Sequence, residues 1–418
     1  MKEADGYRPL RPFSSLKYSR YALGLLFTIN LLNYIDRQVL FAVFPLIKSE
    51  MRLSDTALGF LGSAFMASYM VSAPVLGWFG DRFGRVKLAG WGLSLWSVAT
   101  ATTGLARGYN SLLISRATVG IGEASFGTVS PGLISDFFPK ERRGRVLSFF
   151  YLAIPVGSAI GYMMGGVLGQ AFGWRSAFFM AALPGLMLAV PIFLLHEPQR
   201  GGTEQVPERA HPAPGEYISL LKNRSFAITT LAMAAMTFAL GGLAQWLPTF
   251  LYRIHGQSIA AGNALFGAIT VISGIAGTLT GGWLGDRFQG KSGKGYLKVS
   301  GAGFLVGAPI AVYAIISSSL YGCLTAIFFA EFFLFFNTGP LNTTIVNVTS
   351  PSVRAMAFAV NIFFIHALGD AVSPALLGRL SDLWGLRTAL LITPIMIVLA
   401  AGFSFLGAGF IEKDTWGA

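Results

Sequence analysis

Long apolar segments follow one another along almost the whole chain, with only short polar breaks between them. Each segment is long enough to cross a bilayer as a helix, which takes about 20 residues. The runs are continuous and lack the alternation, in stretches of about ten residues, of a membrane β-barrel. The pattern therefore predicts an all-α membrane protein with about twelve transmembrane helices. Their approximate extents are 18–47, 57–80, 86–106, 110–136, 144–172, 174–195, 224–253, 258–286, 296–318, 320–349, 352–381 and 386–411.

A polar stretch divides the apolar segments into two sets of six. Residues 196–223 are rich in Pro, Gly and charge and are predicted to form a cytoplasmic linker. We therefore expect two six-helix bundles, 18–195 and 224–411, with a cytoplasmic N-terminal segment at 1–17 and a cytoplasmic tail at 412–418. The first apolar run is interrupted by charge and precedes no small-residue cleavage pattern, so no signal peptide is predicted.

Composition and charge placement fit this membrane assignment. Hydrophobic residues make up 53% of the chain and charged residues 12%, whereas soluble domains average about 25% charge. Lys and Arg gather in the N-terminal segment and in the loops of one side, and the positive-inside rule places both termini in the cytoplasm. This asymmetry explains the net charge of +12, so no nucleic-acid partner is expected. We expect a multi-pass protein of the bacterial inner membrane, acting as a monomer. The one cysteine, Cys323, excludes an internal disulfide framework.

A short charged phrase occurs twice, as GWFGDRFGR at residues 77–85 and as GWLGDRF at residues 282–288. Each copy follows the second helix of its half, on the predicted cytoplasmic side, so the two halves are parallel, pseudo-symmetric repeats. With the twelve-helix layout, the first copy resembles the loop signature of the major facilitator superfamily of transporters. The resemblance implies the major facilitator fold, in which two bundles rock around a site near the middle of the membrane.

The same resemblance implies that the two phrases form a gating latch on the cytoplasmic side. Asp81 would meet the eleventh helix, and Asp286 would meet the fifth, when the protein opens outward. Gly77 permits close helix approach, and Gly84 permits a tight turn. The second copy lacks the Gly-Arg pair of the first, so we expect its latch to be looser. The predicted latch residues are Gly77, Asp81, Arg82, Gly84, Arg85, Asp286 and Arg287.

Three glycines recur at four-residue spacing in the fifth apolar segment. Gly157, Gly161 and Gly165 would share one helix face, where small residues allow close helix packing. The spacing resembles the glycine-rich motif of antiporter-type family members. Generic helix packing explains it equally well.

Charged side chains inside membrane spans are costly and usually functional. Asp36 and Arg37 are adjacent, so they point about 100° apart and cannot pair well with each other. Arg116 and Glu123 share a helix face but lie about 10 Å apart. We therefore predict pairs between helices, Asp36 with Arg116 and Arg37 with Glu123, lining a cavity in the first half. A purely structural ion-pair network is the alternative.

Asp36 and Glu123 are the candidates for proton coupling. Burial favours the protonated form of a carboxyl group, and a neighbouring Arg favours the ionised form. A motion that changes either influence can therefore load and release a proton. Protons are the only coupling species expected, and no cofactor or metal site is predicted.

Three further titratable residues lie in the second half. Glu331 is surrounded by Phe residues and would be neutral or reach a cavity. His366 could titrate near neutrality, although a lone His on an aromatic helix face is usually a packing residue. Asp370 lies close to helix-loosening Gly369 and Pro374, which mark a possible gating bend. We assign these three residues to the substrate and charge network.

Three phrases of the first half resemble the spinster branch of the superfamily, whose members are associated with lysolipid and sphingoid-lipid export. They are NYIDRQVL, RATVGIGEASFGTVSP and DFFPKERRGRVLSFFYLAIPVGSAIGY. The chain also has 35 Phe and 8 Trp, with few polar residues in its second half. We therefore expect a largely apolar cavity wall in the second half, opposite a charged wall in the first. Such a cavity suits an amphiphile.

Three functions stay open on the sequence. The first is a proton-coupled transporter of a lipid-like amphiphile with an anionic head group. The second is a proton symporter of small organic anions, such as sugar acids or aromatic acids. The third is a non-transporting membrane sensor, against which the gating latch argues. An enzyme is not expected, because no phosphate loop, metal-ligand cluster or plausible catalytic triad lies outside the spans. The expected partners are the substrate and the bilayer.

Overall fold

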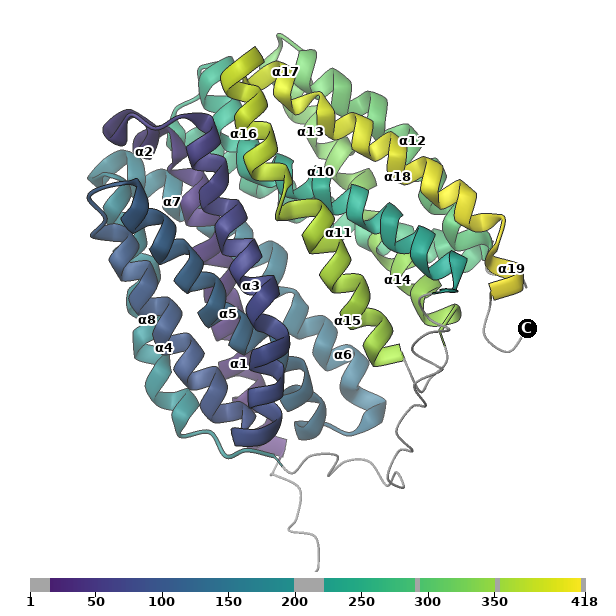
Figure 1. The fold of residues 1–418 in the computed structure, drawn as a ribbon, viewed down its shortest axis with the longest axis horizontal. Helices are drawn as coiled ribbons and strands as arrows, with labels where there is room; N and C mark the ends of the chain where they lie inside the picture. Colours follow the sequence, from purple (N-terminus) through teal and green to yellow (C-terminus); the bar gives the residue numbers. More distant parts are fainter. Residues whose placement is uncertain (1–15, 199–221, 290–293, 350–353, 415–418) are drawn as a thin grey trace, which may run out of the picture.

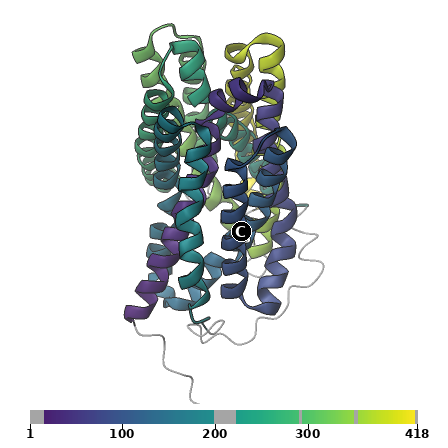
Figure 2. The same ribbon diagram turned by 90° about the vertical axis from the view of Figure 1, so that its left-hand side faces the viewer.

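The computed structural model describes residues 16–198, 222–289, 294–349 and 354–414, and every regular element in these ranges is helical. Most of the predicted linker, most of the N-terminal segment and part of the C-terminal tail lie outside these ranges. In Figure 1 the helices of the second half are inclined to those of the first half, and in the side view of Figure 2 both sets run lengthwise through the molecule. The described part of the chain is therefore a helical bundle, as the apolar pattern predicts.

The first half contains six membrane-length segments, two of which are made of two consecutive helices. Its helices are α1 (Leu16–Ala42), α2 (Phe44–Met51), α3 (Asp55–Phe83), α4 (Arg85–Gly104), α5 (Tyr109–Phe137), α6 (Lys140–Tyr151), α7 (Ala153–Phe172) and α8 (Trp174–Phe193).

The second half repeats this plan with more interruptions. Its helices are α10 (Arg224–His255), α11 (Ile259–Phe288), α12 (Lys294–Ile316), α13 (Leu320–Phe335), α14 (Thr338–Asn347), α15 (Arg354–Ile365), the π-helical η1 (His366–Asp370), α16 (Ser373–Trp384), α17 (Leu386–Leu390), α18 (Ile392–Ala408) and α19 (Ile411–Asp414). Gly173 before α8 and Gly385 before α17 share positive φ values of 82° and 83°. Glycine tolerates this backbone, so the same turn joins the fifth to the sixth segment in each half.

Five apolar segments predicted as continuous helices are broken, which corrects the sequence prediction. The breaks follow α1, α6, α13, α15 and α17, and the first of them precedes Pro45 at the start of α2. Proline cannot donate a backbone hydrogen bond to the preceding turn, so the helix restarts there. Apolar length alone does not reveal such breaks.

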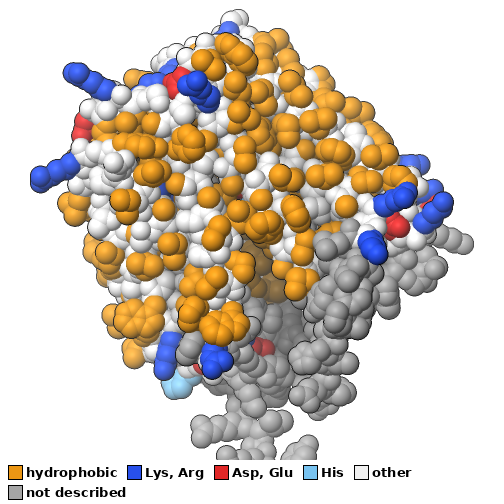
Figure 3. Space-filling model, in the orientation of Figure 1, with side chains coloured by type: hydrophobic (Ala, Val, Ile, Leu, Met, Phe, Trp, Pro, Cys, Tyr) orange, Lys and Arg blue, Asp and Glu red, His pale blue; other side chains and the backbone are white. Residues whose placement is uncertain are grey.

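Nine segments of the described chain are long and apolar enough to cross a membrane. The other three long helices, α1, α4 and α5, have 27, 20 and 29 residues and are more polar. Large apolar side chains are exposed along many helices, and one face of the molecule is widely covered by them (Figure 3). Such a surface is unsuited to water and suited to a bilayer.

The two halves meet along a seam formed chiefly by α3 with α16 and by α7 with α11. We call the end that holds the α2–α3 and α10–α11 connections the closed end, because the halves touch there. The other end, which holds the α3–α4 connection, is the open end, and Figure 3 shows a recess between the halves on that side. A Cβ atom added at Gly59 of α3 would lie 2.8 Å from Ala375 of α16. At the opposite end, a Cβ atom added at Gly77 or Gly282 would meet no described atom within 4 Å.

Candidate functional site

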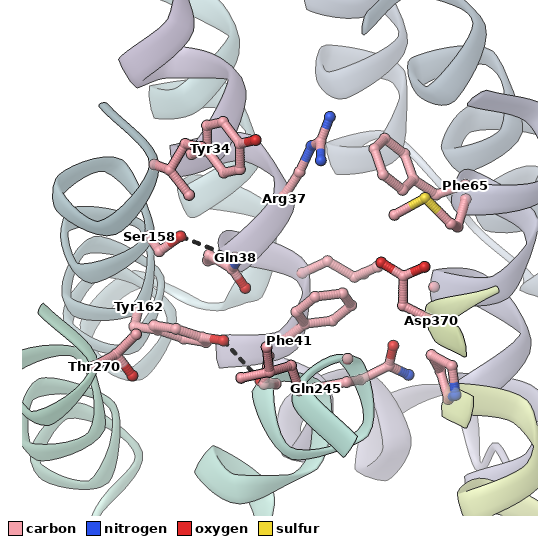
Figure 4. Close-up of a pocket in the computed structure, with 18 of the residues that line it drawn as sticks. Tyr34, Arg37, Gln38, Phe41, Phe65, Ser158, Tyr162, Gln245, Thr270 and Asp370 are labelled. Atoms are coloured by element: carbon pink, nitrogen blue, oxygen red, sulfur yellow. Dashed lines mark hydrogen bonds between the residues drawn. The ribbon is translucent and has the colours of Figure 1, made fainter. Parts of the chain in front are cut away.

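A cavity of about 270 Å³ lies at the seam and is lined by both halves (Figure 4). The first half contributes α1, α3, α5 and α7, and the second contributes α10, α11, α13, η1 and α16. Lining residues of the first half are Tyr34, Arg37, Gln38, Leu40, Phe41, Gly62, Phe65, Met66, Arg116, Ile154, Ser158 and Tyr162. Those of the second half are Leu240, Gly241, Ala244, Gln245, Phe266, Thr270, Glu331, Phe335, Asp370 and Pro374.

Four charged side chains, which we call the charge network, pair beside this cavity. Nε of Arg37 donates to Oε2 of Glu123 at 2.7 Å, and Nη1 of Arg116 donates to Oδ1 of Asp36 at 3.4 Å. Both contacts run from α1 to α5, in the combination that helix spacing predicts. The hydroxyl of Thr100 on α4 donates to Asp36 at 2.5 Å, a contact that no pattern in the sequence predicts.

Aromatic rings hold the guanidinium group of Arg37 in place. It lies 4.8 Å from the ring centroid of Tyr34, 5.0 Å from that of Phe65 and 5.2 Å from that of Tyr69. These distances are within range of cation–π attraction. The rings and Glu123 together fix the orientation of a cation at the cavity wall.

Only two of the four residues of the charge network line the cavity. This corrects the prediction that all four line a cavity in the first half. Arg37 and Arg116 are among the lining residues, whereas Asp36 and Glu123 are not. Asp36 is 2% exposed and Glu123 is 0% exposed. The cavity also belongs to both halves, and not to the first alone. The first-half wall therefore presents cations, with their carboxylate partners behind them.

The second-half wall is mostly apolar, as the sequence suggested, but it also contains four polar side chains. Glu331 and Asp370 both line the cavity. Glu331 accepts hydrogen bonds from the hydroxyl groups of Thr270 at 3.3 Å and Ser273 at 3.2 Å, both on α11. Few polar residues occur in this half, but helix packing turns several of them toward the seam. Among these, Gln245 and Thr270 were not predicted as site residues.

The segment around Asp370 forms a bend, as the sequence suggested. His366–Asp370 is π-helical, Gly369 has a non-helical backbone, and Pro374 lies in the first turn of α16. Nδ1 of His366 lies 2.8 Å from Oδ1 of Asp370. π-helical turns inside α-helices often occur at functional sites. Here the bend places Asp370 at the cavity, whereas His366 is not a lining residue.

A second ionic cluster, which no pattern in the sequence predicted, joins the halves at the closed end. Asp55, at the start of α3, accepts hydrogen bonds from Arg253 of α10 at 2.7 and 2.8 Å. It also accepts from Lys48 at 2.5 Å and from Ser381 of α16 at 2.5 Å. In return, Asp382 of α16 accepts from the first backbone N–H groups of α3. This cluster spans the seam.

Replacing Asp55 with asparagine should open the closed end. The amide keeps the shape but loses the charge that holds Arg253 and Lys48, at a cost of about 1.5–3 kcal/mol for a charged hydrogen bond. The equilibrium between closed and open forms should shift roughly ten-fold or more. Distances between spin labels across the closed end test this. Glu50→Gln is the control, because Glu50 pairs with Arg175 of its own half. An equal shift in both variants would contradict this assignment.

The first copy of the repeated phrase is partly described. The side chain of Asp81 falls outside the described residues. Gly84 has φ of 100°, which confirms the tight turn. Arg85 donates to Asp136 of α5 at 2.7 Å and to Glu197, beyond α8, at 3.3 Å. Arg82 is exposed and lies 5.7 Å from the ring of Trp78. Arg85 therefore ties together three segments of its own half.

The second copy makes contacts within its own half as well. Oδ1 of Asp286 accepts a hydrogen bond from the hydroxyl group of Tyr296 at 2.8 Å. Arg287 is exposed and lies 5.7 Å from the ring of Trp283. These contacts belong to a form that is closed at the opposite end, so they leave the gating role of Asp81 and Asp286 as a prediction.

The glycine face of the fifth segment packs onto α1. A Cβ atom added at Gly157 would lie 2.9 Å from Tyr34, and one at Gly161 would lie 2.9 Å from Gln38. One at Gly165 would lie 2.7 Å from Ala42. The three glycines thus allow α7 to approach the helix that carries Asp36 and Arg37. They serve packing inside the first half.

Comparison with known proteins identifies the family. The sequence matches the Major Facilitator Superfamily profile over residues 26–374. It is also 36% identical to Protein spinster homolog 1 of Xenopus laevis, over 96% of this chain and 82% of that protein. The chain belongs to the spinster branch of the major facilitator superfamily. It is accordingly an integral, multi-pass membrane protein of a transporter family, and not of a family of enzymes.

Other spinster proteins cover the chain almost completely. The Sphingosine-1-phosphate transporter SPNS2 of Xenopus tropicalis is 33% identical over 99% of this chain and 86% of that protein. The fold is also that of a bacterial homolog of the human lysosomal transporter spinster, solved in an inward-facing and unoccupied conformation. The two structures agree with a TM-score of 0.88 at 24% identity, over 97% of this chain and 100% of that one.

Proposed function

We propose that the protein is a proton-coupled secondary active transporter that carries a lipid-like amphiphile by alternating access. The observation that carries this proposal is the Arg37–Glu123 pair. The Arg37 side chain is 16% exposed at the cavity, whereas its partner Glu123 is fully buried. A cation that faces the substrate space is therefore held by a carboxylate that protonation can neutralise.

This arrangement links a proton to an anionic substrate. Ionised Glu123 competes with a substrate anion for the guanidinium group of Arg37. Protonation of Glu123 frees that group, so a proton and an anionic head group favour each other's binding. Arg116 and Asp36 form a second pair of this kind deeper in the bundle, where Arg116 is 1% exposed. Protonation of Asp36 would free Arg116 in the same way.

Two observations favour a lipid-like substrate. The aromatic side chains of Tyr34, Phe41, Phe65 and Phe335 supply apolar surface next to the cationic wall. One of the relatives is named a sphingosine-1-phosphate transporter, and that substrate joins a phosphate to an apolar chain. A small organic anion would use the cationic wall but not the apolar one.

Sidedness follows from the positive-inside rule. It places both termini in the cytoplasm, which makes the closed end the outer end and the described form inward-facing. The proposed location is the bacterial inner membrane, and the proposed working unit is a monomer because both walls of the cavity come from one chain. Protons are the proposed coupling species, without a cofactor.

In the alternate form, the repeated phrases would close the open end. Asp81→Asn should weaken that closure and enrich the inward-facing form, because the amide loses the charge favoured at a helix N-terminus, worth about 0.3–1 kcal/mol. The reactivity of cysteine probes placed at the open end measures how much of the protein is in the inward-facing form. Asp286→Asn should have the smaller effect, since the second phrase lacks the Gly-Arg pair. A larger effect of Asp286→Asn would contradict the order of the two latches.

Transport by the purified protein in liposomes tests the proposal as a whole. A pH gradient should drive uptake of a radiolabelled lysophospholipid with a phosphate head group, and Arg37→Ala should abolish it. If an excess of a soluble sugar acid competed fully, the organic-anion alternative would be favoured instead. If neither the lysophospholipid nor the sugar acid were transported, although both still bound to the protein, the sensor alternative would be favoured.

A further inference from the structure

A second cavity, of about 590 Å³, lies on the seam between α3 and α16. Its walls include Phe60, Val372 and Leu376, whose side chains are 50%, 45% and 39% exposed. In a membrane-spanning bundle, such exposed apolar side chains face lipid. We call this cavity the seam groove. It is separate from the central cavity, with which it shares no lining residue.

One end of the groove is polar, and the rest of the groove is mainly apolar. Thr56, Phe60 and Ser63 line it from α3, and their spacing of four and three residues places them along one side of that helix over about 10 Å. Arg379 and Leu376 line it from α16. Thr56 donates to Asp382 at the closed end, so the groove descends from that end toward the middle of the bundle.

Two polar groups in the groove have no partner among the described residues. Arg379 is exposed, and its guanidinium group has no hydrogen bond or ion pair among the described residues, while the carboxylate of Asp382, one turn away on α16, is bound to the start of α3. Ser63 is 7% exposed, and its hydroxyl group is buried without a hydrogen bond. Buried polar groups normally have a partner. A ligand that fills the groove would have to offer an anion at one end and a hydrogen-bonding group farther in.

We propose that the seam groove binds a single-chain membrane lipid with a phosphate head group. The phosphate pairs with Arg379 at the depth of the lipid head groups, and the ester or hydroxyl group of the lipid meets Ser63. The chain lies along Phe60, Val372 and Leu376. Because these walls are open to the bilayer, the occupant arrives from the membrane and is a lipid, and not a soluble anion.

The position of the groove gives this lipid an effect on conformation. One wall belongs to each half, and the halves must separate there when the closed end opens. A lipid that contacts both walls binds the closed form better, and it therefore stabilises that form. This inference does not depend on the proposed transport function of the central cavity.

Native mass spectrometry of the full-length protein in detergent tests the proposal. The probe is palmitoyl lysophosphatidic acid, and monopalmitoylglycerol is its uncharged counterpart. The experiment uses an Arg37→Ala background, which removes the exposed cation of the central cavity. One equivalent of the charged lipid should be retained, and Arg379→Gln should lower its affinity about five-fold. The uncharged counterpart should bind more weakly and should not respond to Arg379→Gln.

A second variant fills the groove without changing its charge. Ala375→Trp should displace the charged lipid, because Ala375 lines the groove. Ile395→Trp is the matched control, since Ile395 is an exposed apolar residue of α18 outside the groove. Retention of the charged lipid by both Arg379→Gln and Ala375→Trp, at the affinity of the parent protein, would overturn the proposal. Equal binding of the uncharged lipid would overturn the phosphate assignment.

Discussion

Replacing Gly59 with alanine should move the protein from the form described here toward the form that is open at the opposite end. The added Cβ would lie 2.8 Å from the Cα of Ala375 and 2.8 Å from the carbonyl carbon of Pro374, both in the other half. Overpacking of this kind costs about 1–3 kcal/mol. The higher helix propensity of alanine contributes to both forms and cancels. We therefore expect the population ratio of the two forms to change by about five-fold to one hundred-fold.

Two further glycine variants separate this effect from a general loss of stability. Gly161→Ala creates an equally tight contact with Ile35 of α1, but inside the first half. It should lower the thermal stability without favouring either form. Gly402→Ala meets no described atom within 4 Å, so it should leave the equilibrium between the forms unchanged. The higher helix propensity of alanine inside α18 should raise its thermal stability, by up to about 1 kcal/mol. Spin-label distances and melting curves distinguish the three variants, and a Gly59→Ala protein with unchanged distances would contradict rigid closure at the seam.

Replacing Glu123 with glutamine, or Asp36 with asparagine, should remove most of the pH dependence of the conformational equilibrium. An amide carries the charge of a protonated carboxyl group, so each variant mimics one loaded state. The form described here contains both ion pairs, so acidification of the wild type should shift the population away from it. A charged hydrogen bond contributes about 1.5–3 kcal/mol, which corresponds to a shift of roughly ten-fold or more.

Glu331→Gln is the informative control for these two variants. Glu331 is buried and lines the cavity, but its hydrogen-bond partners are hydroxyl groups and not cations. Its replacement should leave the pH dependence in place. Distances between labelled helix ends, measured across pH, decide the matter. If Asp36→Asn and Glu123→Gln both titrate like the wild type, His366 and Asp370 become the next candidates for the coupling site.

Helix geometry is the reason that part of the site was predictable. The helices fix which neighbours a side chain cannot reach, so Asp36 and Arg37 had to pair with another helix. Arg116 and Glu123, two turns apart on one helix, offered the matching spacing. The structure forms both pairs, and the family comparisons support the fold that the repeated phrase suggested.

The closed end was not predictable in the same way. Asp55 and Arg253 lie 198 residues apart in the chain and at the ends of their helices, where a charge is ordinary. Nothing local marks them as partners, because their meeting depends on how the two halves dock. The polar residues in the mostly apolar wall of the second half were missed for a related reason. Sparse polar residues such as Gln245 and Thr270 line the cavity because they lie on the helix face that points toward the seam. The amino-acid composition does not show which face a residue occupies.

We propose that the two ends of the protein open in turn around one cavity. Spin labels replace Leu105 and Tyr321 at the closed end in one variant, and Lys87 and Lys298 at the open end in another, with Cys323 changed to serine in both. Each pair places one label in each half. On acidification, we expect a longer distance at the closed end and a shorter one at the open end, with the same pH midpoint. Distances that lengthen together, or that change at one end only, would contradict it.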